Sequence, residues 1–372
     1  METPIVLDFG SQTCRVGNAG ESMPTNIFPS YVGIPRERSQ LKPDFYVGKI
    51  LKEQKREFQI KSPIKNGTIE DISMASALFK NALDECQGYG KPILFTEPAL
   101  NPKQIREKTI QLLFERFKAP SVYFSIQPIL SLFASEKTDG LVIDSGADIT
   151  QIIPIYEGYV ISSCVHKQYI AGNDLLEYLV STISEKRDVN LSTAAAKEVL
   201  ENQVKKDCLV ALDLMDVVRL SSDPDLLRTY TLPDGTEFSI EEERFLCPEI
   251  LFRPELFIND DILAKGLDVA CYECVMKCDI DVRRCLFGNI LCAGGNTLYP
   301  GFAERLASGV QKLCNDSIEV GIEAPADRQY SSWIGGSIFA SISEFNQLAV
   351  NSFEYDEFGA QIINKKCKIS WD

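Results

Sequence analysis

The feature that most constrains the fold is a pattern that occurs twice, near the start of the chain and again in its middle. At 6–16 and at 141–158, an apolar run ends in an aspartate, a glycine follows two positions later, and a second apolar run resumes. This order predicts two β-hairpins with glycine-containing turns, each with a carboxylate, Asp8 or Asp144, near its tip. Because a domain's length of chain separates the copies, the repeating unit is a whole domain.

Both turns suit a phosphate. Backbone N–H groups of a turn rich in glycine and serine can point into one concavity and receive phosphate oxygens. An aspartate at each strand end can hold a hydrated Mg²⁺, because this ion takes oxygen ligands and keeps several of its waters. Two such hairpins facing each other would clamp a polyphosphate, whereas one hairpin alone would be an ordinary turn.

The composition excludes some classes of protein. The length of 372 residues allows two to three domains, and 45% hydrophobic with 24% charged residues is typical of a soluble globular chain. The net charge of −15 disfavours nucleic acid or an anionic membrane as a direct partner. The local groups of basic residues are interpreted as solvated faces: Lys52, Lys55, Arg56, Lys61, Lys365, Lys366 and Lys368.

The first residues, Met-Glu-Thr-Pro, do not form a signal peptide, and no apolar run approaches the length of a membrane span. We therefore expect a cytoplasmic (cytoskeletal) or nuclear protein. Among the twelve cysteines, Cys271, Cys274 and Cys278 are spaced as one stripe of a helix. A zinc site would need thiolates from separate segments, because His166 is the only histidine, so we interpret these cysteines as small core residues.

Strands and helices alternate along the rest of the chain. Predicted strands cover 30–33, 92–96, 121–126 and 289–293, and a hairpin with an Asp-Gly turn covers 230–238. Predicted helices cover 102–117, with Asn101 as N-cap and Pro102 at N1, then 127–135, 173–185, 193–212, 262–278 and 332–345, and one bearing Phe302, Leu306 and Val310. The polar segment 34–45 is predicted to be an exposed loop.

Gly294 and Gly295 lie between a predicted strand and a predicted helix. Glycines at such a place let a flat ring or a phosphate approach the backbone, although a plain turn would show the same pattern. Two halves, each begun by a phosphate-type hairpin, indicate an α/β architecture with a ligand between the halves.

Several segments, in their order along nearly the whole chain, resemble the actin family: 100–103, 126–135, 143–146, 154–158, 276–279 and 333–338. The resemblance implies an actin-like ATPase fold, with two duplicated α/β domains around a nucleotide cleft. The first domain would be discontinuous, 1–135 plus 331–372, and the second would be 136–330.

The resemblance also implies a site for ATP or ADP with Mg²⁺ or Ca²⁺. Asp8 and Asp144 would hold the metal through water, and Gln127 would orient the attacking water, with Gln151 near it. Arg15 stands where a lysine of the family reaches the phosphates. The other nucleotide-binding positions are Gly10, Ser11, Gln12 and Gly146 at the phosphates, and Gly172, Lys205, Gly294, Gly295, Leu298 and Tyr299 around ribose and adenine.

The departures from the family pattern lie at the same turns. Phe9 and Gln12 are expected to add bulk beside the phosphates, and Ala147 loses a carboxylate. Asp148 replaces a glycine, so its carboxylate would repel phosphate unless it turns away or meets the metal. Gln151 replaces a histidine and can hydrogen-bond water but cannot accept a proton at neutral pH. Val204, Lys205 and Gln329 replace the usual Lys, Glu and Lys, so we expect nucleotide binding with weak or slow hydrolysis.

The surface expected to contact other subunits also differs. The loop at 34–45 is shorter than the family's, Asn66 replaces a commonly methylated histidine, and the tail extends past Cys367. These changes suggest a divergent actin or actin-related protein that self-associates, joins an actin-type filament, or binds actin-binding proteins. The alternatives are a non-polymerising scaffold subunit of a larger complex (dynactin-like or chromatin-remodelling) with a structural nucleotide, and a small-molecule kinase. A kinase would need a catalytic aspartate base, and no further motif supplies one.

Overall fold

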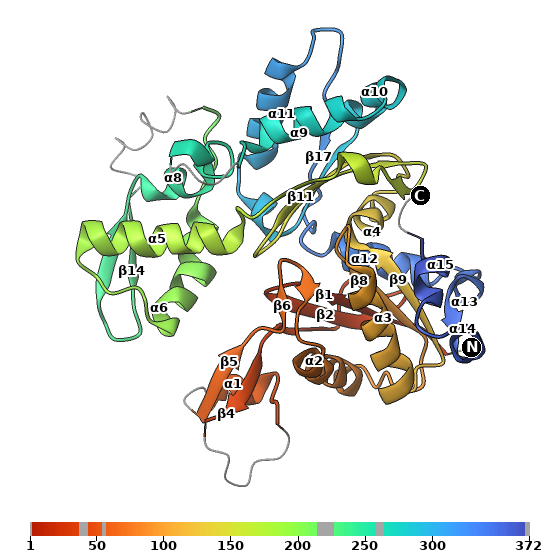
Figure 1. Ribbon diagram of the computed structural model, residues 1–372. Coiled ribbons are helices and arrows are strands. Elements are labelled where there is room, and N and C mark those ends of the chain that lie inside the picture. Colours follow the sequence, from red (N-terminus) through yellow and green to blue (C-terminus); the bar gives the residue numbers. More distant parts are fainter. Residues whose placement is uncertain (1, 37–43, 54–56, 214–226, 257–263, 369–372) are drawn as a thin grey trace. The chain divides into compact units, whose positions relative to one another are not determined.

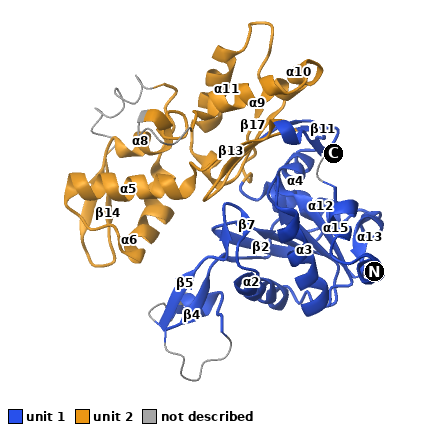
Figure 2. Cartoon of the chain, in the orientation of Figure 1, with its two compact units in different colours: residues 1–142, 155–163, 329–372 blue, residues 143–154, 164–328 orange. Residues whose placement is uncertain are grey.

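The computed structural model describes residues 2–36, 44–53, 57–213, 227–256 and 264–368. The chain divides into two compact units, which are drawn in different colours in Figure 2. Unit 1 comprises Met1–Val142, Ile155–Ser163 and Gln329–Asp372, and unit 2 comprises Ile143–Pro154 and Cys164–Arg328. Lys55, Arg56, most of the predicted loop at 34–45 and the tail beyond Lys368 lie outside the described residues.

Unit 1 is built on a sheet with the strand order β18-β9-β8-β1-β2-β3 (Figure 1). Its strands are β1 (Ile5–Phe9), β2 (Thr13–Asn18), β3 (Asn26–Pro29), β8 (Ile93–Glu97), β9 (Ser121–Ile126) and β18 (Val350–Asn351). Three neighbours, β1, β8 and β9, run parallel, and β1 forms the predicted antiparallel hairpin with β2. Shorter pairs are β4 (Val32–Pro35) with β5 (Phe58–Lys61), and β6 (Ile64–Lys65) with β7 (Thr68–Ile69).

Helices cover both faces of this sheet, and β1 is therefore buried at every position. Ile5 and Leu7 belong to an apolar cluster with residues of α2 and α3, whereas Val6 belongs to a second cluster with residues of α4 and α12. The helices of unit 1 are α1 (Lys49–Glu53), α2 (Ile72–Glu85), α3 (Lys103–Gln111), η2 (Leu112–Arg116), α4 (Gln127–Ala134), α12 (Ser331–Ala340), α13 (Phe345–Leu348), α14 (Ser352–Phe358) and α15 (Ile362–Lys366). The predictions for 92–96, 121–126 and 127–135 are confirmed within one residue at each end.

The helix α12 is fixed to the sheet by Trp333. This side chain is fully buried, and its Nε1 donates to the Val6 carbonyl oxygen at 3.2 Å. Where α12 meets α4, a Cβ atom added at Gly335 would lie 1.8 Å from the Leu130 carbonyl oxygen. The two helices therefore pack at a distance that only a glycine permits.

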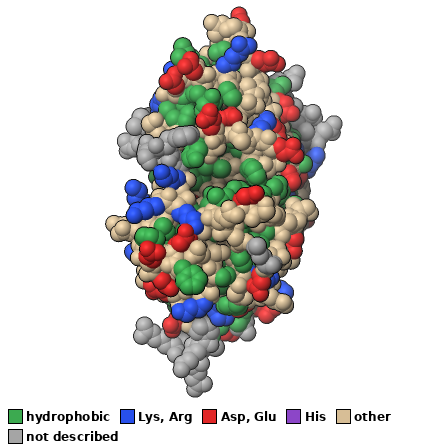
Figure 3. Space-filling view, turned by 90° about the vertical axis from the view of Figure 1, so that its right-hand side faces the viewer, with side chains coloured by type: hydrophobic (Ala, Val, Ile, Leu, Met, Phe, Trp, Pro, Cys, Tyr) green, Lys and Arg blue, Asp and Glu red, His purple; other side chains and the backbone are tan. Residues whose placement is uncertain are grey.

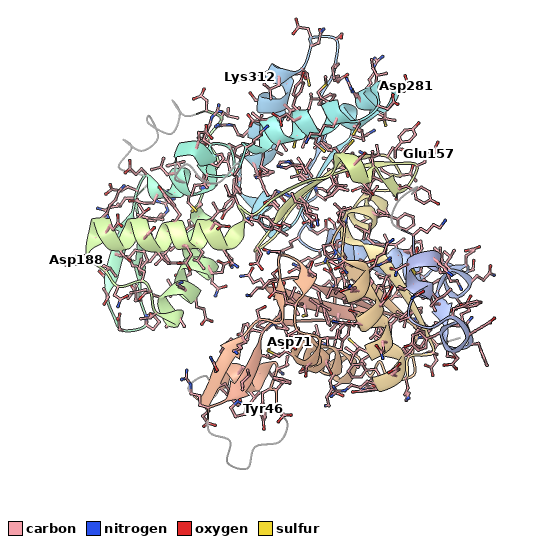
Figure 4. All side chains as sticks on the ribbon, viewed as in Figure 1. Tyr46, Asp71, Glu157, Asp188, Asp281 and Lys312 are labelled. Carbon is pink, nitrogen blue, oxygen red and sulfur yellow. The ribbon has the colours of Figure 1, made fainter. Side chains whose placement is uncertain are left out.

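A local cap explains where α2 begins, whereas the next helix has no side-chain cap. The Asp71 carboxylate, labelled in Figure 4, accepts from the Met74 N–H at 2.9 Å and caps α2. The prediction of Asn101 as the N-cap of the next helix is wrong. Pro102 holds that position, and the Asn101 amide instead donates to Glu97 Oε2 at 2.9 Å.

Unit 2 also combines strands and helices. In its sheet, β10 (Gly140–Ser145) lies between β11 (Thr150–Tyr156) and β16 (Ile290–Ala293), β17 (Ile322–Glu323) pairs with β16, and β13 (His166–Gln168) pairs with β11. The predicted hairpin at 230–238 is confirmed as β14 (Arg228–Thr231) and β15 (Glu237–Ile240). The helices are α5 (Gly172–Arg187), α6 (Ala194–Val199), η4 (Leu200–Val204), η5 (Lys205–Asp207), α8 (Glu243–Glu249), η7 (Pro254–Leu256), α9 (Leu267–Lys277), α10 (Ile280–Gly288), η8 (Gly295–Leu298) and α11 (Phe302–Leu313).

Several predicted elements differ in extent, because tertiary contacts set their ends. The helix predicted to reach 212 ends at Asp207, because the next backbone N–H groups bond outside it, Leu209 to Arg244 and Val210 to Pro300. The helix predicted from 262 begins at Leu267, after Gly266, which packs against the Phe252 carbonyl. The helix predicted to reach 345 ends at Ala340, and the strand predicted at 30–33 covers Val32–Pro35 instead.

None of the twelve cysteines, all of which lie in the described part of the chain, forms a disulfide, and ten of them are buried. Cys271, Cys274 and Cys278 are buried along α9 and at its end, which confirms their interpretation as core residues. Burial raises the pKa of Cys14, Cys274, Cys292 and Cys367 to about 12.

Charge is distributed over the surface. On the face drawn in Figure 3, acidic side chains are scattered among apolar and neutral ones. The basic tail group is partly neutralised, because Lys366 pairs with Glu354 at 2.7 Å. Among the described residues, no helix combines the length and the apolar character needed to cross a membrane.

Candidate functional site

In unit 1, three polar side chains lie where neighbouring parallel strands end. Asp8 is near the end of β1, Thr96 near the end of β8, and Gln127 begins α4 directly after β9. Because the carboxyl ends of adjacent parallel strands meet at one edge of a sheet, the fold brings these residues together. Ligands bind at this edge in open α/β sheets.

Asp8 is the centre of this group. Its side chain is fully buried, and its Oδ1 accepts from Thr96 Oγ1 at 2.6 Å and from Gln127 Nε2 at 2.9 Å. The Arg15 guanidinium donates from Nη1 to Asp8 Oδ2, also at 2.9 Å. Arg15 reaches it because β1 and β2 pair with Asp8 directly opposite Arg15. Both oxygens of the carboxylate are therefore bonded.

The first glycine turn closes on itself. The Gly10 N–H donates to the Thr13 carbonyl at 3.0 Å, and Ser11 Oγ accepts from the Gly67 N–H at 3.0 Å. Gln12 is exposed beyond them. The expectation that Phe9 adds bulk beside the phosphates is wrong, because successive strand residues point to opposite faces. Phe9 packs in the core against Phe79, with ring centroids 4.8 Å apart.

In unit 2, one turn joins three segments that are far apart in sequence. The Gly146 N–H donates to the Ile149 carbonyl at 3.0 Å, which closes the turn after β10. The Gly146 carbonyl accepts from the Gly172 N–H at 3.0 Å and from Asn296 Nδ2 at 3.1 Å. The predicted site residues Asp144, Gly146, Gly172 and Gly294 are thus brought together within this unit.

Gly294 is required to be a glycine for two reasons. Its φ of +85° is one that side-chain-bearing residues rarely adopt. In addition, a Cβ atom here would lie 2.3 Å from the Ser145 carbonyl oxygen and 2.6 Å from Asp144 Oδ1. The close approach of β16 to the carboxylate turn therefore depends on the missing side chain.

We expect Gly294→Ala to destabilise the protein by about 2–4 kcal/mol, because it adds a contact with backbone to a strained φ. Gly235→Ala is the matched control, since Gly235 has a φ of +89° with no atom within 4 Å of its added Cβ. The control should lose only the stability that alanine costs at a positive φ, about 1 kcal/mol. Urea unfolding measures both variants, and equal losses would contradict the close packing at Gly294.

Asp148, which replaces a glycine of the family pattern, turns toward the start of α5. Its Oδ1 accepts from Asn173 Nδ2 at 2.6 Å, and the Asn173 N–H donates to the Ala147 carbonyl at 2.8 Å. Burial raises the pKa of the neighbouring Asp174 carboxyl, and the negative charge of Asp148 adds to the rise. Unit 2 thus places several carboxylates beside one turn.

Gln151 has an acceptor that no protein group satisfies. The side chain is 2% exposed, and its Oε1 is buried without a hydrogen-bond partner. A buried amide oxygen in this state is suited to accept from a bound water or ligand. The chain's only histidine, His166, is not near Gln151 in sequence, and burial lowers its pKa.

The residues predicted to surround ribose and adenine lie next to two of these glycines, Gly172 and Gly294. Lys205 Nζ donates to the Gly172 carbonyl at 3.2 Å and lies 3.3 Å from Glu201 Oε1. Gly295 is exposed and begins η8, which leads through Leu298 to Tyr299. The Tyr299 hydroxyl is buried without a hydrogen-bond partner, and burial raises its pKa well above the usual value.

Two residues of the site were missed from the sequence, Thr96 and Asn296. Threonine is common in strands, so the sequence around Thr96 gives no signal of a site. Its contact with Asp8 is indicated only by its place near the end of β8, which is a parallel neighbour of β1. Asn296 follows the glycine pair, and its amide bonds Ser145 Oγ at 3.3 Å as well as the Gly146 carbonyl.

The donor set limits how a metal could bind. In the part of the chain that the structure describes, no three His, Cys, Asp or Glu side chains are grouped so as to hold a metal ion. A divalent ion near Asp144 would therefore take most of its ligands from water and phosphate oxygens, which is the usual coordination of Mg²⁺ at nucleotides.

The comparison with known protein families agrees with this arrangement. The family model described as actin matches residues 1–368, nearly the whole chain. This match, together with the mixed strands and helices of both units, confirms the expected actin-like α/β fold. The chain belongs to the actin family.

Proposed function

We propose that this protein binds ATP or ADP with Mg²⁺ or Ca²⁺ and uses the nucleotide in actin-type assembly, with slow hydrolysis. The observation that carries the proposal is the group at the ends of β1, β8 and β9, where Asp8 holds both Gln127 and Arg15. The glycine junction of unit 2 supports it, because Gly146, Gly172 and Gly294 let three separate segments of backbone pack closely beside Asp144. The two domains would be 1–135 plus 331–372 and 136–330.

In this proposal two glutamines, Gln127 and Gln151, bind water. The Gln127 amide nitrogen is anchored on Asp8, which leaves its carbonyl oxygen to orient a water molecule. In unit 2, Gln151 Oε1 can accept a hydrogen bond from a bound water. When bound, the metal supplies positive charge to the phosphate oxygens. Neither glutamine takes up a proton at neutral pH, so hydrolysis would be slow.

The first prediction for this site is the loss of phosphate release in Gln127→Ala. Loss of the oriented water should lower the single-turnover rate about 10- to 100-fold while the affinity for nucleotide stays nearly unchanged. Gln347→Ala is the control, since Gln347 is an exposed glutamine of the same unit. An unchanged rate in Gln127→Ala would remove this residue from the mechanism.

The partner and the location are also proposals. We propose self-association or assembly with other actin-family subunits and actin-binding proteins, in the cytoplasm or the nucleus. Sedimentation of the purified chain with Mg-ATP tests self-association, and a pellet that requires nucleotide supports it.

A scaffold subunit with a structural nucleotide is the second candidate, favoured by Gln151 in place of a histidine. It predicts bound ATP, released only on denaturation, with neither turnover nor a pellet. Nucleotide extracted from the denatured protein and separated by chromatography distinguishes ADP from ATP. Transfer of phosphate to a sugar would instead indicate a kinase.

A further inference from the structure

The group around Asp8 points to a consequence for the cation requirement of the nucleotide site. We propose that Arg15 supplies in this chain positive charge that a divalent ion would otherwise supply, so that nucleotide binds with little dependence on the metal. In this proposal Asp8 positions Arg15 and is not a metal-side residue. The inference rests on the proposed nucleotide binding.

Both carboxylate oxygens of Asp8 already accept hydrogen bonds from protein groups. Thr96, Gln127 and Arg15 bond its two oxygens at 2.6, 2.9 and 2.9 Å, and its side chain is fully buried. A cation placed beside this carboxylate would be repelled by the Arg15 guanidinium, whose Nη1 lies 2.9 Å from Asp8 Oδ2. At an edge with little water, repulsion of this kind is weakly screened. The donor set of unit 1 therefore does not fit a metal at Asp8.

Arg15 has hydrogen-bond donors that Asp8 does not use. A guanidinium carries five N–H groups, and one of them, on Nη1, donates to Asp8. The Nε of Arg15 is buried and has no hydrogen-bond partner. The side chain is 18% exposed, so part of the guanidinium still reaches solvent. A cation with unused donors and an open side is suited to bind phosphate oxygens.

Contacts on two sides fix the position of the Arg15 side chain. The β1–β2 register sets it opposite Asp8, and the Tyr330 ring lies 5.7 Å from its guanidinium carbon. Cation–π contact and ion pair together fix the planar group before a ligand arrives. A lysine at this position would have its three donors on one nitrogen, whereas the guanidinium spreads five donors over three nitrogens in a fixed plane. Arginine can therefore keep one nitrogen on Asp8 while another bonds a phosphate.

The test is the affinity of the full-length protein for a fluorescent etheno analogue of ATP, measured with Mg²⁺ and with EDTA. For the natural chain, the Kd in EDTA should exceed the Kd in Mg²⁺ by less than about 10-fold. In Arg15→Gln, the Kd in EDTA should rise about 10- to 100-fold, because charge-assisted hydrogen bonds to phosphate are lost. The Kd in Mg²⁺ should rise much less, because the ion then supplies the charge.

Arg15→Lys keeps the test decisive if Arg15→Gln does not fold, because lysine still neutralises Asp8. Its ratio of Kd in EDTA to Kd in Mg²⁺ should exceed that of the natural chain, since the lysine must serve Asp8 and a phosphate from a single nitrogen. The nucleotide-induced rise in Tm, measured in both buffers, is a readout independent of fluorescence and of catalysis.

The outcomes separate the two proposals. Binding that requires Mg²⁺ equally in the natural chain and in Arg15→Lys would overturn the role of Arg15 and leave nucleotide binding intact. No binding by the folded natural chain in either buffer would overturn the proposed function and this inference together.

Discussion

Replacement of Gly335 by alanine is expected to lower the free energy of unfolding by about 3 kcal/mol or more, or to prevent folding. The added Cβ would lie 1.8 Å from the Leu130 carbonyl oxygen and 2.5 Å from its carbon, both of which are backbone atoms of α4. Neither can move without displacing a helix that carries Gln127 at its start. We therefore expect nucleotide binding to fall together with stability.

Gly336→Ala, in the same helix, is the matched control. There the added Cβ would meet the ends of two side chains, Val6 Cγ1 at 2.9 Å and Leu94 Cδ2 at 3.2 Å, which can shift. Both variants gain about 1 kcal/mol of helix propensity, so the difference between them reports the contact with backbone. Urea unfolding followed by the fluorescence of the buried Trp333 measures this difference, and equal losses would mean that α12 can move away from α4.

The second large effect is expected from Arg106→Leu, with a loss of about 3–5 kcal/mol. The Arg106 Nε donates to Glu97 Oε1 at 2.9 Å, and its other nitrogens donate to Asn364 Oδ1 and to the Cys367 carbonyl at 2.9 and 2.7 Å. Glu97 is 1% exposed, so the variant leaves a buried carboxylate without its cationic partner, with only the Asn101 amide still bonded to it. The variant also loses the link between α3 and the end of α15.

The pH dependence of this loss has a definite sign. Burial raises the pKa of Glu97, and Arg106 opposes the rise, so removing Arg106 should raise that pKa further. A protonated Glu97 needs no partner, so the loss should be greatest at neutral pH and shrink as the pH falls toward the ordinary carboxyl pKa. Lys80→Ala, which breaks the exposed Lys80–Asp84 pair, should cost about 0.5 kcal/mol or less at every pH. A loss in Arg106→Leu that does not change with pH would contradict the unpaired carboxylate as its cause.

Much of the architecture followed from local patterns in the sequence. The strand at 121–126 was predicted to the residue because apolar side chains run to a glutamine and proline that begin the next helix. The two Asp-x-Gly hairpins were predicted because glycine after an aspartate at a strand end is a local signal. The Asp-Gly turn at 234–235 is of the same kind, with Asp234 Oδ1 accepting from the Thr236 N–H.

What the sequence did not predict depends on distant partners. The end of η5 is set by hydrogen bonds from Leu209 to Arg244 and from Val210 to Pro300, which no local window contains. The bonds from Thr96 and Gln127 to Asp8 depend on three strands being parallel and adjacent. Phe9 follows Asp8 directly in β1, so the alternation of strand side chains directs it to the opposite face, into the core.

The division of unit 1 into separated segments has a consequence for synthesis. The strands β1, β8 and β9 leave the ribosome before 329–372 has been made, and all of unit 2 is translated in between. At about 5–20 residues per second, this interval lasts roughly 10–40 s. Until then Val6, Leu94 and Leu130 lack the Trp333 and Phe345 side chains with which they form one apolar cluster. During this interval the apolar face formed by these residues has no partner within the nascent chain, and exposed apolar surface of this kind is prone to aggregation.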